Sequence, residues 1–194
     1  MSGPLLTPDL PQAHFNSKHL FFRPLTVHDK AMYFSLYTNE QVMRHIGPPL
    51  SQEQVETLFS YTLKRTNGRG HLRLSWALVA RRSGKCIGIV ALTWDLALKG
   101  AASIGVMLVS EEQGKGYGLE AQGALAEYGF TSLGLVRIHS QFAVNNSANE
   151  RIYHKLGFIA EDHKAGLANN TLPTKFCYLD KQGWQRSFIK NFPG

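Results

Sequence analysis

The segment Gln113-Gly-Lys-Gly-Tyr-Gly118 places three glycines at alternate positions between an apolar run, residues 101–109, and a helical pattern, residues 117–133. Glycine lets backbone N–H groups turn toward a ligand and approach it closely. The N–H groups at a helix start favour phosphate, because they lie at the positive end of the helix dipole. The segment therefore predicts a pyrophosphate site, although a tight connection without a ligand would use the same glycines. Its spacing matches neither the P-loop nor the dinucleotide-binding fingerprint.

Hydrophobic periodicity divides the rest of the chain into short strands and helices. Strands are expected at residues 19–25, 72–79, 86–94, 101–109, 136–144, 158–161 and 174–179. Helices are expected at residues 28–37, 117–133 and 148–156, with a short helix or turn at 39–46. A further helix begins at a capping box of Ser51 and Gln54 and ends near Asn67. This order predicts one α+β domain over residues 19–190, after an irregular leader over residues 1–18.

Composition limits the classes of protein that the chain can be. The chain has 194 residues, of which 43% are hydrophobic, so it can bury a substantial core. Its net charge of +7 favours anionic partners such as polyphosphates or nucleic acid. No apolar stretch approaches the roughly 20 residues that cross a bilayer, and residues 1–11 lack the pattern of a secretory signal.

The cysteines indicate a cellular compartment, and the spacing of cysteines and histidines argues against a metal site. Cys86 and Cys177 lie inside strand patterns, as reduced thiols of a cytoplasmic protein would. No cluster of His and Cys residues has metal-ligand spacing. We therefore expect a cytoplasmic protein with no metal site and no membrane contact.

Two separated motifs resemble one enzyme family. Gln113-x-x-Gly116-x-Gly118 is similar to the Q/R-x-x-G-x-G/A motif of the GNAT (Gcn5-related) N-acetyltransferases. The segment Asn146-Ser-Ala-Asn149-Glu-Arg-Ile-Tyr153-His-Lys-Leu-Gly157-Phe158 resembles a second motif of that family. The segments Phe22-Arg-Pro-Leu-Thr26 and 39–51 resemble the RimJ/RimL-like branch. The resemblance implies a GNAT fold, in which a mixed, mostly antiparallel central sheet is flanked by helices.

The resemblance also implies acetyl-CoA as cofactor and assigns residues to it. The implied cofactor-binding residues are Val106, Met107, Leu108, Gln113, Gly114, Lys115, Gly116, Tyr117, Gly118, Asn146 and Asn149. The strand that pairs with the pantetheine arm usually bears a bulge, and the N–H of Leu108 is the expected oxyanion donor. Asn146 could equally well cap a helix without any ligand.

The catalytic groups are assigned less completely. Tyr153 matches the tyrosine that protonates the departing thiolate, and a phenol pKa of about 10 against about 8.5 for a thiol suits that task. Where relatives place a glutamate base, this chain has Gln141, which cannot accept a proton at neutral pH. His139, two residues back on the same strand face, is the candidate base, and Asp95 and His45 are further candidates. Water could also serve, with proximity of the reactants supplying most of the rate.

The resemblance implies that the acceptor is a primary amine, to which the acetyl group is transferred directly. His45, Trp94 and Asp95 are the candidate substrate-binding residues. The mixture of aromatic and basic groups suits a neutral or anionic acceptor, such as a peptide or protein N-terminus, an aminoacyl group or a small molecule. A site that binds a polyamine is expected to contain several carboxylates.

Two other functions are compatible with the same fold. The chain could be a non-catalytic acyl-CoA-binding module, or a toxin that acetylates aminoacyl-tRNA. Nucleic acid is therefore expected only as a tRNA-linked acceptor, and the protein is expected to be a monomer or a homodimer.

Overall fold

The computed structural model describes residues 14–67, 73–94, 97–161, 166–167 and 172–191, and its strands form one sheet. The strands are β1 Phe15–Asn16, β2 Leu20–Pro24, β3 Arg73–Ala80, β4 Cys86–Trp94, β5 Ala101–Leu108, β6 Arg137–Ala143, β7 Ile159–Ala160, β8 Gly166–Leu167 and β9 Pro173–Asp180. Their order across the sheet is β1-β2-β3-β4-β5-β6-β9-β7, and β8 pairs with β9. Every pair is antiparallel except β5 with β6, which is parallel.

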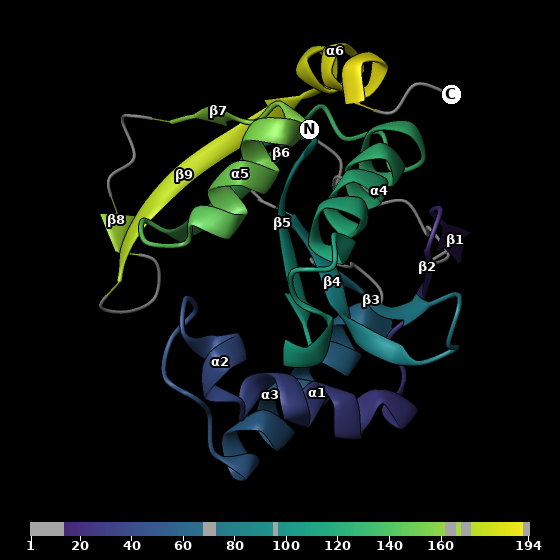
Figure 1. Ribbon diagram of the computed structural model, residues 1–194, viewed down its shortest axis with the longest axis vertical. Coiled ribbons are helices and arrows are strands. Elements are labelled where there is room, and N and C mark those ends of the chain that lie inside the picture. Colours follow the sequence, from purple (N-terminus) through teal and green to yellow (C-terminus); the bar gives the residue numbers. More distant parts are fainter. Residues whose placement is uncertain (1–13, 68–72, 95–96, 162–165, 168–171, 192–194) are drawn as a thin grey trace, which may run out of the picture.

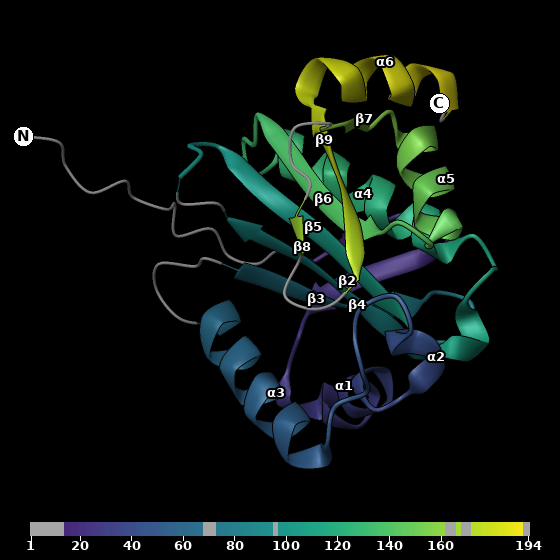
Figure 2. The ribbon, with the colours of Figure 1, turned by 90° about the vertical axis from the view of Figure 1, so that its left-hand side faces the viewer.

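Helices cover both faces of this sheet (Figures 1 and 2). The helices are η1 Val27–Asp29, α1 Lys30–Tyr37, α2 Glu40–Met43, α3 Gln52–Asn67, η2 Ser110–Glu112, α4 Tyr117–Thr131, α5 Ser147–Leu156 and α6 Lys181–Asn191. Helices α1 to α3 lie against one face, and α4 to α6 lie against the other. Along the described ranges, no helix has both the length and the apolar character needed to cross a membrane.

The two faces have separate hydrophobic cores, because side chains alternate along each strand. On the α1–α3 face, Ala77, Ile89 and Met107 pack with the first three helices. On the α4 face, Trp76 and Ile104 belong to the larger core, which continues into α4 and α5. The alternation therefore tells us on which side of the sheet each strand residue lies.

The parallel pair β5–β6 stays together over a short stretch only. Its ladder joins Ala101–Ser103 to Arg137–His139, but β5 continues to Leu108 and β6 to Ala143. Over these same residues β5 stays paired with β4, and β6 stays paired with β9. The sheet is therefore split between β5 and β6 beyond Ser103.

Most elements lie where the sequence predicts them. Strand β4 has the expected bounds, and the capping box at α3 is present: the Ser51 N–H donates to Gln54 Oε1 at 2.8 Å, and the Gln54 N–H donates to Ser51 Oγ at 3.2 Å. Helix α6 and strand β8 were not predicted. Trp184 of α6 is buried against Phe130 of α4, with ring centroids 6.4 Å apart, so this helix depends on a contact distant in sequence.

The expected irregular leader needs a correction at its end. Residues 1–13 lie outside the described residues, but β1 pairs with β2 at the sheet edge. Phe15 stacks between Phe22 at 4.2 Å and Tyr128 at 4.4 Å, measured between ring centroids. This aromatic stack ties the segment to the sheet and to α4 at once.

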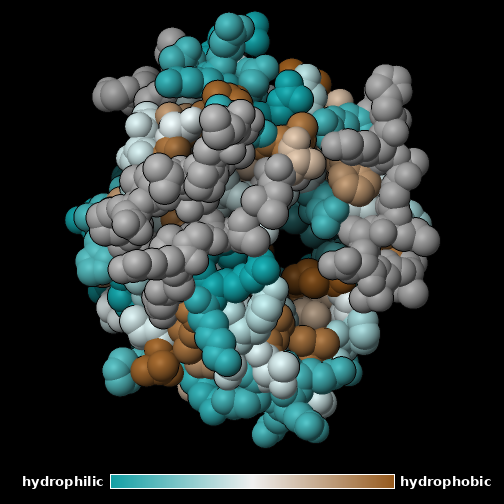
Figure 3. All heavy atoms as spheres, turned by 180° about the vertical axis from the view of Figure 1, so that it is seen from behind, coloured by the Kyte–Doolittle hydropathy of each residue, from teal (hydrophilic) through white to brown (hydrophobic). Residues whose placement is uncertain are grey.

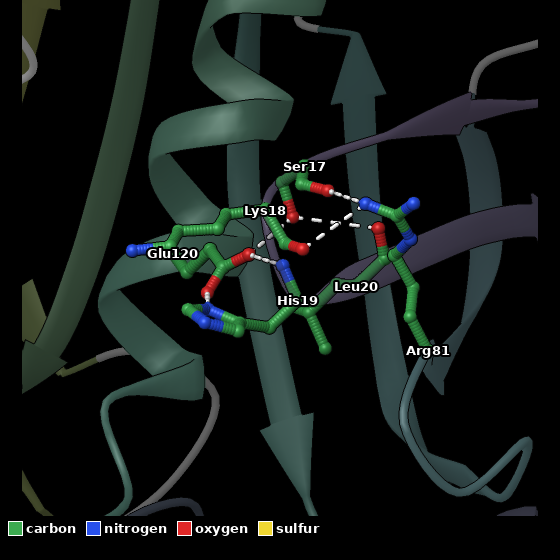
Figure 4. A network of polar contacts seen from close by, with 6 residues as sticks. All are labelled: Ser17, Lys18, His19, Leu20, Arg81 and Glu120. Carbon is green, nitrogen blue, oxygen red and sulfur yellow. Dashed lines mark hydrogen bonds and ion pairs between the residues drawn. The ribbon is translucent and has the colours of Figure 1, made fainter.

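Polar contacts tie the same segment to the first turn of α4 (Figure 4). The Glu120 carboxylate accepts the Ser17 hydroxyl at 2.6 Å, the His19 N–H at 2.6 Å and a His19 ring nitrogen at 2.8 Å. Arg81 donates to the Ser17 and Lys18 carbonyl oxygens at 3.0 Å each. Burial alone would raise the pKa of Glu120, but these hydrogen bonds outweigh burial and leave the pKa lowered.

Candidate functional site

The split between β5 and β6 opens into a cavity of about 580 Å³. Its walls come from β5, β6, the starts of α4 and α5, and the α1–α2 region. A cavity of this size is in the range of small-molecule sites. Figure 3 shows the molecule from behind, where hydrophobic and hydrophilic side chains border a hollow near the middle of the face.

The predicted phosphate-binding turn is at one end of the cavity. Gly114 and Gly116 have φ of 77° and 88°, in the left-handed region that favours glycine, and Gly116 is the N-cap of α4. The N–H groups in the first turn of a helix have no intrahelical acceptor, and in α4 no side chain caps them. A Cβ added to Gly114 or Gly116 would meet nothing within 4 Å. The turn thus offers N–H donors beside open space, which fits a pyrophosphate.

The other residues of this turn differ in what they contact. Gln113 lines the cavity and donates from Nε2 to the Leu108 carbonyl oxygen at 3.1 Å, which fixes the turn to the end of β5. Lys115 pairs with Glu112 at 3.0 Å instead. Lys115 and Tyr117 are not among the described lining residues, so their side chains are not brought to the cavity.

Helix α5 forms another wall of the cavity. Asn146 and Asn149 both line the cavity, and Asn146 Oδ1 accepts the Asn149 N–H at 3.1 Å. Asn146 is therefore a helix cap, as the alternative interpretation expected, and it faces the cavity as well. A Cβ on Gly118 would come within 3.3 Å of Ile152 Cδ1, so this glycine keeps α4 and α5 close.

The exposed edge of β5 supplies backbone groups to the cavity. Val109 donates to the Ile87 carbonyl oxygen at 3.0 Å, so the alternation of an antiparallel ladder turns the N–H groups of Val106 and Leu108 away from β4. These two N–H groups face the split. The expected bulge in this strand is absent, because β4 and β5 pair without a register shift from Ala102 to Leu108. The separation from β6, rather than a bulge, exposes this edge.

Tyr153 reaches the cavity from α5. Its side chain is buried, with the rings of Phe142 at 5.3 Å and Phe158 at 4.8 Å, and it lines the cavity. The Ser140 hydroxyl donates to the Tyr153 oxygen at 2.5 Å. Burial raises the Tyr153 pKa well above its usual value, and the Ser140 hydrogen bond offsets part of this rise. Tyr153 is therefore a protonated phenol whose own hydrogen is available to another acceptor. Ser140 was not singled out from the sequence.

The register separates the Tyr153 hydroxyl from the Leu108 N–H. Ser140 follows His139, which pairs with Ser103, so the Tyr153 hydroxyl lies near the level of Ile104. At about 3.3 Å per residue, Val106 is about 7 Å and Leu108 about 13 Å further along β5. The Tyr153 hydroxyl and the Leu108 N–H are therefore too far apart for both to contact one thioester. Val106 is thus better placed to act together with Tyr153.

The candidate bases fall in different places. His139 is not among the described lining residues; its Nδ1 lies 3.7 Å from Glu161 Oε2 and its ring 6.5 Å from that of Tyr178. Gln141 lines the cavity but cannot take a proton. The structure therefore does not bring His139 to the reacting groups.

The structure does not bring the three predicted substrate-binding residues together. His45 lines the cavity, and its Nδ1 is 3.1 Å from Asn145 Oδ1 across the opening. Trp94 packs against the larger core on the α4 face, away from α1–α3. Asp95 lies outside the described residues.

The lining residues that sequence reasoning did not single out include Tyr37, Arg44 and Arg73, on the α1–α3 side. One signal was available for Arg73. It stands two and four residues before Ser75 and Ala77 in an alternating strand, so its side chain belongs to the inward-facing set.

Comparisons with known proteins relate the chain to acetyltransferases. A family model described as an acetyltransferase (GNAT) domain matches residues 19–159. YoaA, an uncharacterised N-acetyltransferase of Bacillus subtilis, is 27% identical over 146 residues, or 73% of this chain and 80% of the relative. A spermidine N(1)-acetyltransferase of Vibrio cholerae is 26% identical over 149 residues, or 76% of this chain and 83% of the relative.

Solved structures share the fold. The crystal structure of spermidine N-acetyltransferase from Vibrio cholerae in complex with CoA and spermine has a TM-score of 0.73 at 21% identity, over 87% of this chain and 99% of the other. A GNAT-family acetyltransferase from Bacillus anthracis has a TM-score of 0.73 at 18% identity, over 88% and 99%.

Proposed function

The chain belongs to the GNAT acetyltransferase family and is an N-acetyltransferase that uses acetyl-CoA, and from this premise we propose that its acceptor is an amine on a neutral or anionic molecule. The observation that carries the proposal is the charge of the cavity. Among the described lining residues there is no Asp or Glu, whereas Arg44, Arg73, His45, Arg151 and Lys155 all line it.

The described residues fit the two ends of acetyl-CoA. The N–H groups at the start of α4 bind the pyrophosphate next to Gly114 and Gly116. The edge of β5 that faces the split would hold the pantetheine arm, with Leu108 close to the turn among the residues that bind it. Acetyl-CoA supplies an acetyl group as a thioester, whose carbonyl carbon is the electrophile.

The protein groups near Ile104 carry out the transfer. The Val106 N–H takes the oxyanion role expected of Leu108, because only Val106 lies close to the level of the Tyr153 hydroxyl. Tyr153 donates its proton to the leaving sulfur, and Ser140 holds the phenol oxygen so that the proton points into the cavity. Neither cysteine is a lining residue, so the transfer to the amine is direct.

His45 replaces His139 as the candidate side-chain base. It is the only imidazole among the described lining residues. If Asn145 Oδ1 accepts from Nδ1, the proton of the neutral ring is on Nδ1 and Nε2 carries the lone pair that a base needs. Removal of the amine proton to water remains the alternative route, and orientation of the amine supplies the larger part of the rate.

The spermidine acetyltransferases among the relatives offer a second candidate acceptor. A polyamine carries several positive charges, which need carboxylates or carbonyl oxygens when they leave water. In the described part of the cavity the charged side chains are basic, so a polyamine would be repelled. This contrast favours an acceptor with no positive charge beyond its amine.

We also place the chain in the RimJ/RimL-like branch, with a domain that consists of the predicted residues 19–190 and of the β1 segment before them. The resemblance of Phe22 to Thr26 supports this. In that segment Arg23 binds Asp29 through two hydrogen bonds of 2.8 and 2.5 Å, which fix β2 to the start of α1. A peptide N-terminus is therefore one member of the acceptor class.

Release of free thiol from acetyl-CoA tests the proposal. Wild-type protein is incubated with spermidine, with peptides that have a free N-terminus, and with small neutral and anionic amines. We expect kcat/KM for a neutral or anionic amine to exceed that for spermidine. The opposite order would refute the acceptor class. Binding of CoA without turnover of any amine, and without any effect of Tyr153→Phe, would instead indicate a non-catalytic module.

A further inference from the structure

The acceptor half of the cavity has one basic group that is held in place by the sheet itself. Arg73 is half-buried and stands at the start of β3, on the row of the sheet that continues through Thr93 and Ser103. Its Nε donates to Ser75 Oγ at 3.2 Å, and its Nη1 donates to Thr93 Oγ1 at 3.2 Å. The guanidinium is thus oriented by two neutral hydroxyls.

Among the residues that the structure describes, this guanidinium has no carboxylate partner, and some of its N–H donors are not used. Of its five N–H groups, one is bound to Ser75 and one to Thr93, which leaves one on Nη1 and both on Nη2. Within the described ranges it has no carboxylate partner, in contrast with Arg23, which is paired with Asp29. A cation removed partly from water gains from an anion placed against it.

The register places Arg73 on the acceptor side of the reaction. Its strand neighbours on the same face, Ala77 and Ile89, pack against α1–α3, whereas Tyr153 approaches from the opposite face. Tyr37 of α1 lines the same cavity. Burial is the main cause that raises the pKa of Tyr37, and the charge of Arg73 acts in the opposite direction. Both residues line the cavity on its α1–α3 side.

A small molecule can span the distance from Arg73 to the reacting groups. The guanidinium donates to Thr93 on β4, and β4 lies about 4.8 Å from β5. Its row differs from the level of Ile104 by one residue, about 3.3 Å, and from Val106 by three residues, about 10 Å. The floor between them is Ala91 and Gly105, and a Cβ added to Gly105 would meet nothing within 4 Å. A small molecule can therefore lie between Arg73 and the thioester.

We propose that Arg73 is the specificity-determining residue for an acceptor that carries a carboxylate on the order of 5 Å from its reacting amine, which is the length left once contacts of about 3 Å at both ends are subtracted. The fork of Nη1 and Nη2 matches a planar carboxylate, which it can bind through two hydrogen bonds. This inference rests on the proposed function and narrows its acceptor class from neutral or anionic amines to short amino carboxylates.

Binding and turnover are measured separately, so that the two proposals can fail independently. Calorimetry on the protein saturated with CoA gives dissociation constants for γ-aminobutyrate, its neutral carboxamide, n-butylamine and a phosphonate analogue of the acid. We expect γ-aminobutyrate to bind about 10- to 100-fold more tightly than its carboxamide, as a charge-assisted hydrogen bond pair predicts. Tighter binding of the phosphonate than of the carboxylate would overturn the carboxylate assignment.

Variants assign the preference to Arg73. In Arg73→Gln the carboxylate and the carboxamide should bind equally, while the dissociation constant for acetyl-CoA stays within about twofold of wild type. Thr93→Val keeps the charge but loosens its orientation, so it should reduce the preference in part. Arg82→Gln is the matched control, because Arg82 is an exposed arginine in the turn at the other end of β3 and should leave the preference intact.

Three results would overturn the inference. They are equal binding of the acid and the carboxamide to wild type, an unchanged preference in Arg73→Gln, and the same loss in Arg82→Gln. If wild type acetylates n-butylamine as well as γ-aminobutyrate, the inference fails but the proposed acceptor class stands. If it acetylates spermidine best, both fail.

Discussion

Replacing Tyr153 by phenylalanine removes one hydroxyl from the cavity wall and keeps the ring. The contacts with Phe142 and Phe158 are therefore retained, and acetyl-CoA should bind as before. A proton donor in the transition state contributes about 10²- to 10⁴-fold. We expect kcat to fall by at least about 100-fold, or roughly 2.7 kcal/mol of transition-state stabilisation.

The same substitution leaves a buried group without its partner. Ser140 is 4% exposed, and its hydroxyl donates to Tyr153. An unsatisfied buried hydroxyl costs about 1–3 kcal/mol. In a domain of this size the midpoint of thermal unfolding should fall by roughly 2–4 °C for each kcal/mol.

Ser140→Ala and the double variant separate the chemical effect from the structural one. Ser140→Ala leaves the phenol able to meet water in the cavity, so it should cost less stability than Tyr153→Phe. It should still lower kcat, because the phenol loses the bond that orients it. The double variant removes both partners, so it should regain stability relative to Tyr153→Phe while its kcat stays low.

Stopped-flow detection of free thiol gives kcat, and differential scanning calorimetry gives the unfolding midpoint. A wild-type pH profile tests the same group, because burial raises the Tyr153 pKa and keeps the phenol protonated beyond its usual range. The rate should therefore not fall near pH 10. A kcat of Tyr153→Phe within about threefold of wild type would refute the proton-donor role.

Three further perturbations test other parts of the site. Gly116→Glu puts a negative charge at the pyrophosphate turn and should raise the dissociation constant for acetyl-CoA at least about tenfold. Gly84→Glu is the control, because Gly84 is another left-handed glycine beside open space. Equal effects of the two variants would show that the pyrophosphate does not bind at this turn. Gly105→Leu fills the open space over β5, so the KM for the amine should rise while acetyl-CoA binding, measured by calorimetry, is kept. The lowered pKa of Glu120 stabilises the fold at pH values above its unfolded pKa of about 4.3, and this stabilisation is lost as the pH falls through the folded pKa. In acid titrations of the unfolding free energy, Glu120→Gln should therefore lose less stability than wild type. An unchanged titration would contradict the role of the network in Figure 4.

The fold was largely predictable because local signals and hydrophobic periodicity agree along the chain. The capping box of Ser51 and Gln54 marks α3, and alternation marks β3 and β4 within one residue of their observed bounds. The elements that were missed depend on distant contacts. Phe15 is held by a ring contact with Tyr128, and Trp184 by a ring contact with Phe130. Neither contact can be identified from the sequence around Phe15 or Trp184.

The cofactor half of the site follows from sequence for the same reason. The turn from Gln113 to Gly118 is a local structure, whose positive φ values require glycine and whose N–H groups come from the helix start that follows. Asn146 acts as the cap of α5 within its own segment. Residue type and spacing are sufficient where all parts of a site lie on one short stretch of chain.

The acceptor half was decided by tertiary structure alone. The period of a strand tells which residues share a face, but it does not tell which strands are neighbours or where two of them separate. That separation after Ser103 exposes the edge of β5, and it determines that Val106 rather than Leu108 lies near Tyr153. It leaves His139 outside the cavity and places Arg73, from a strand distant in sequence, inside it. The sequence by itself thus determined a protein that binds acetyl-CoA, whereas the register of the sheet decided which side chains meet the amine.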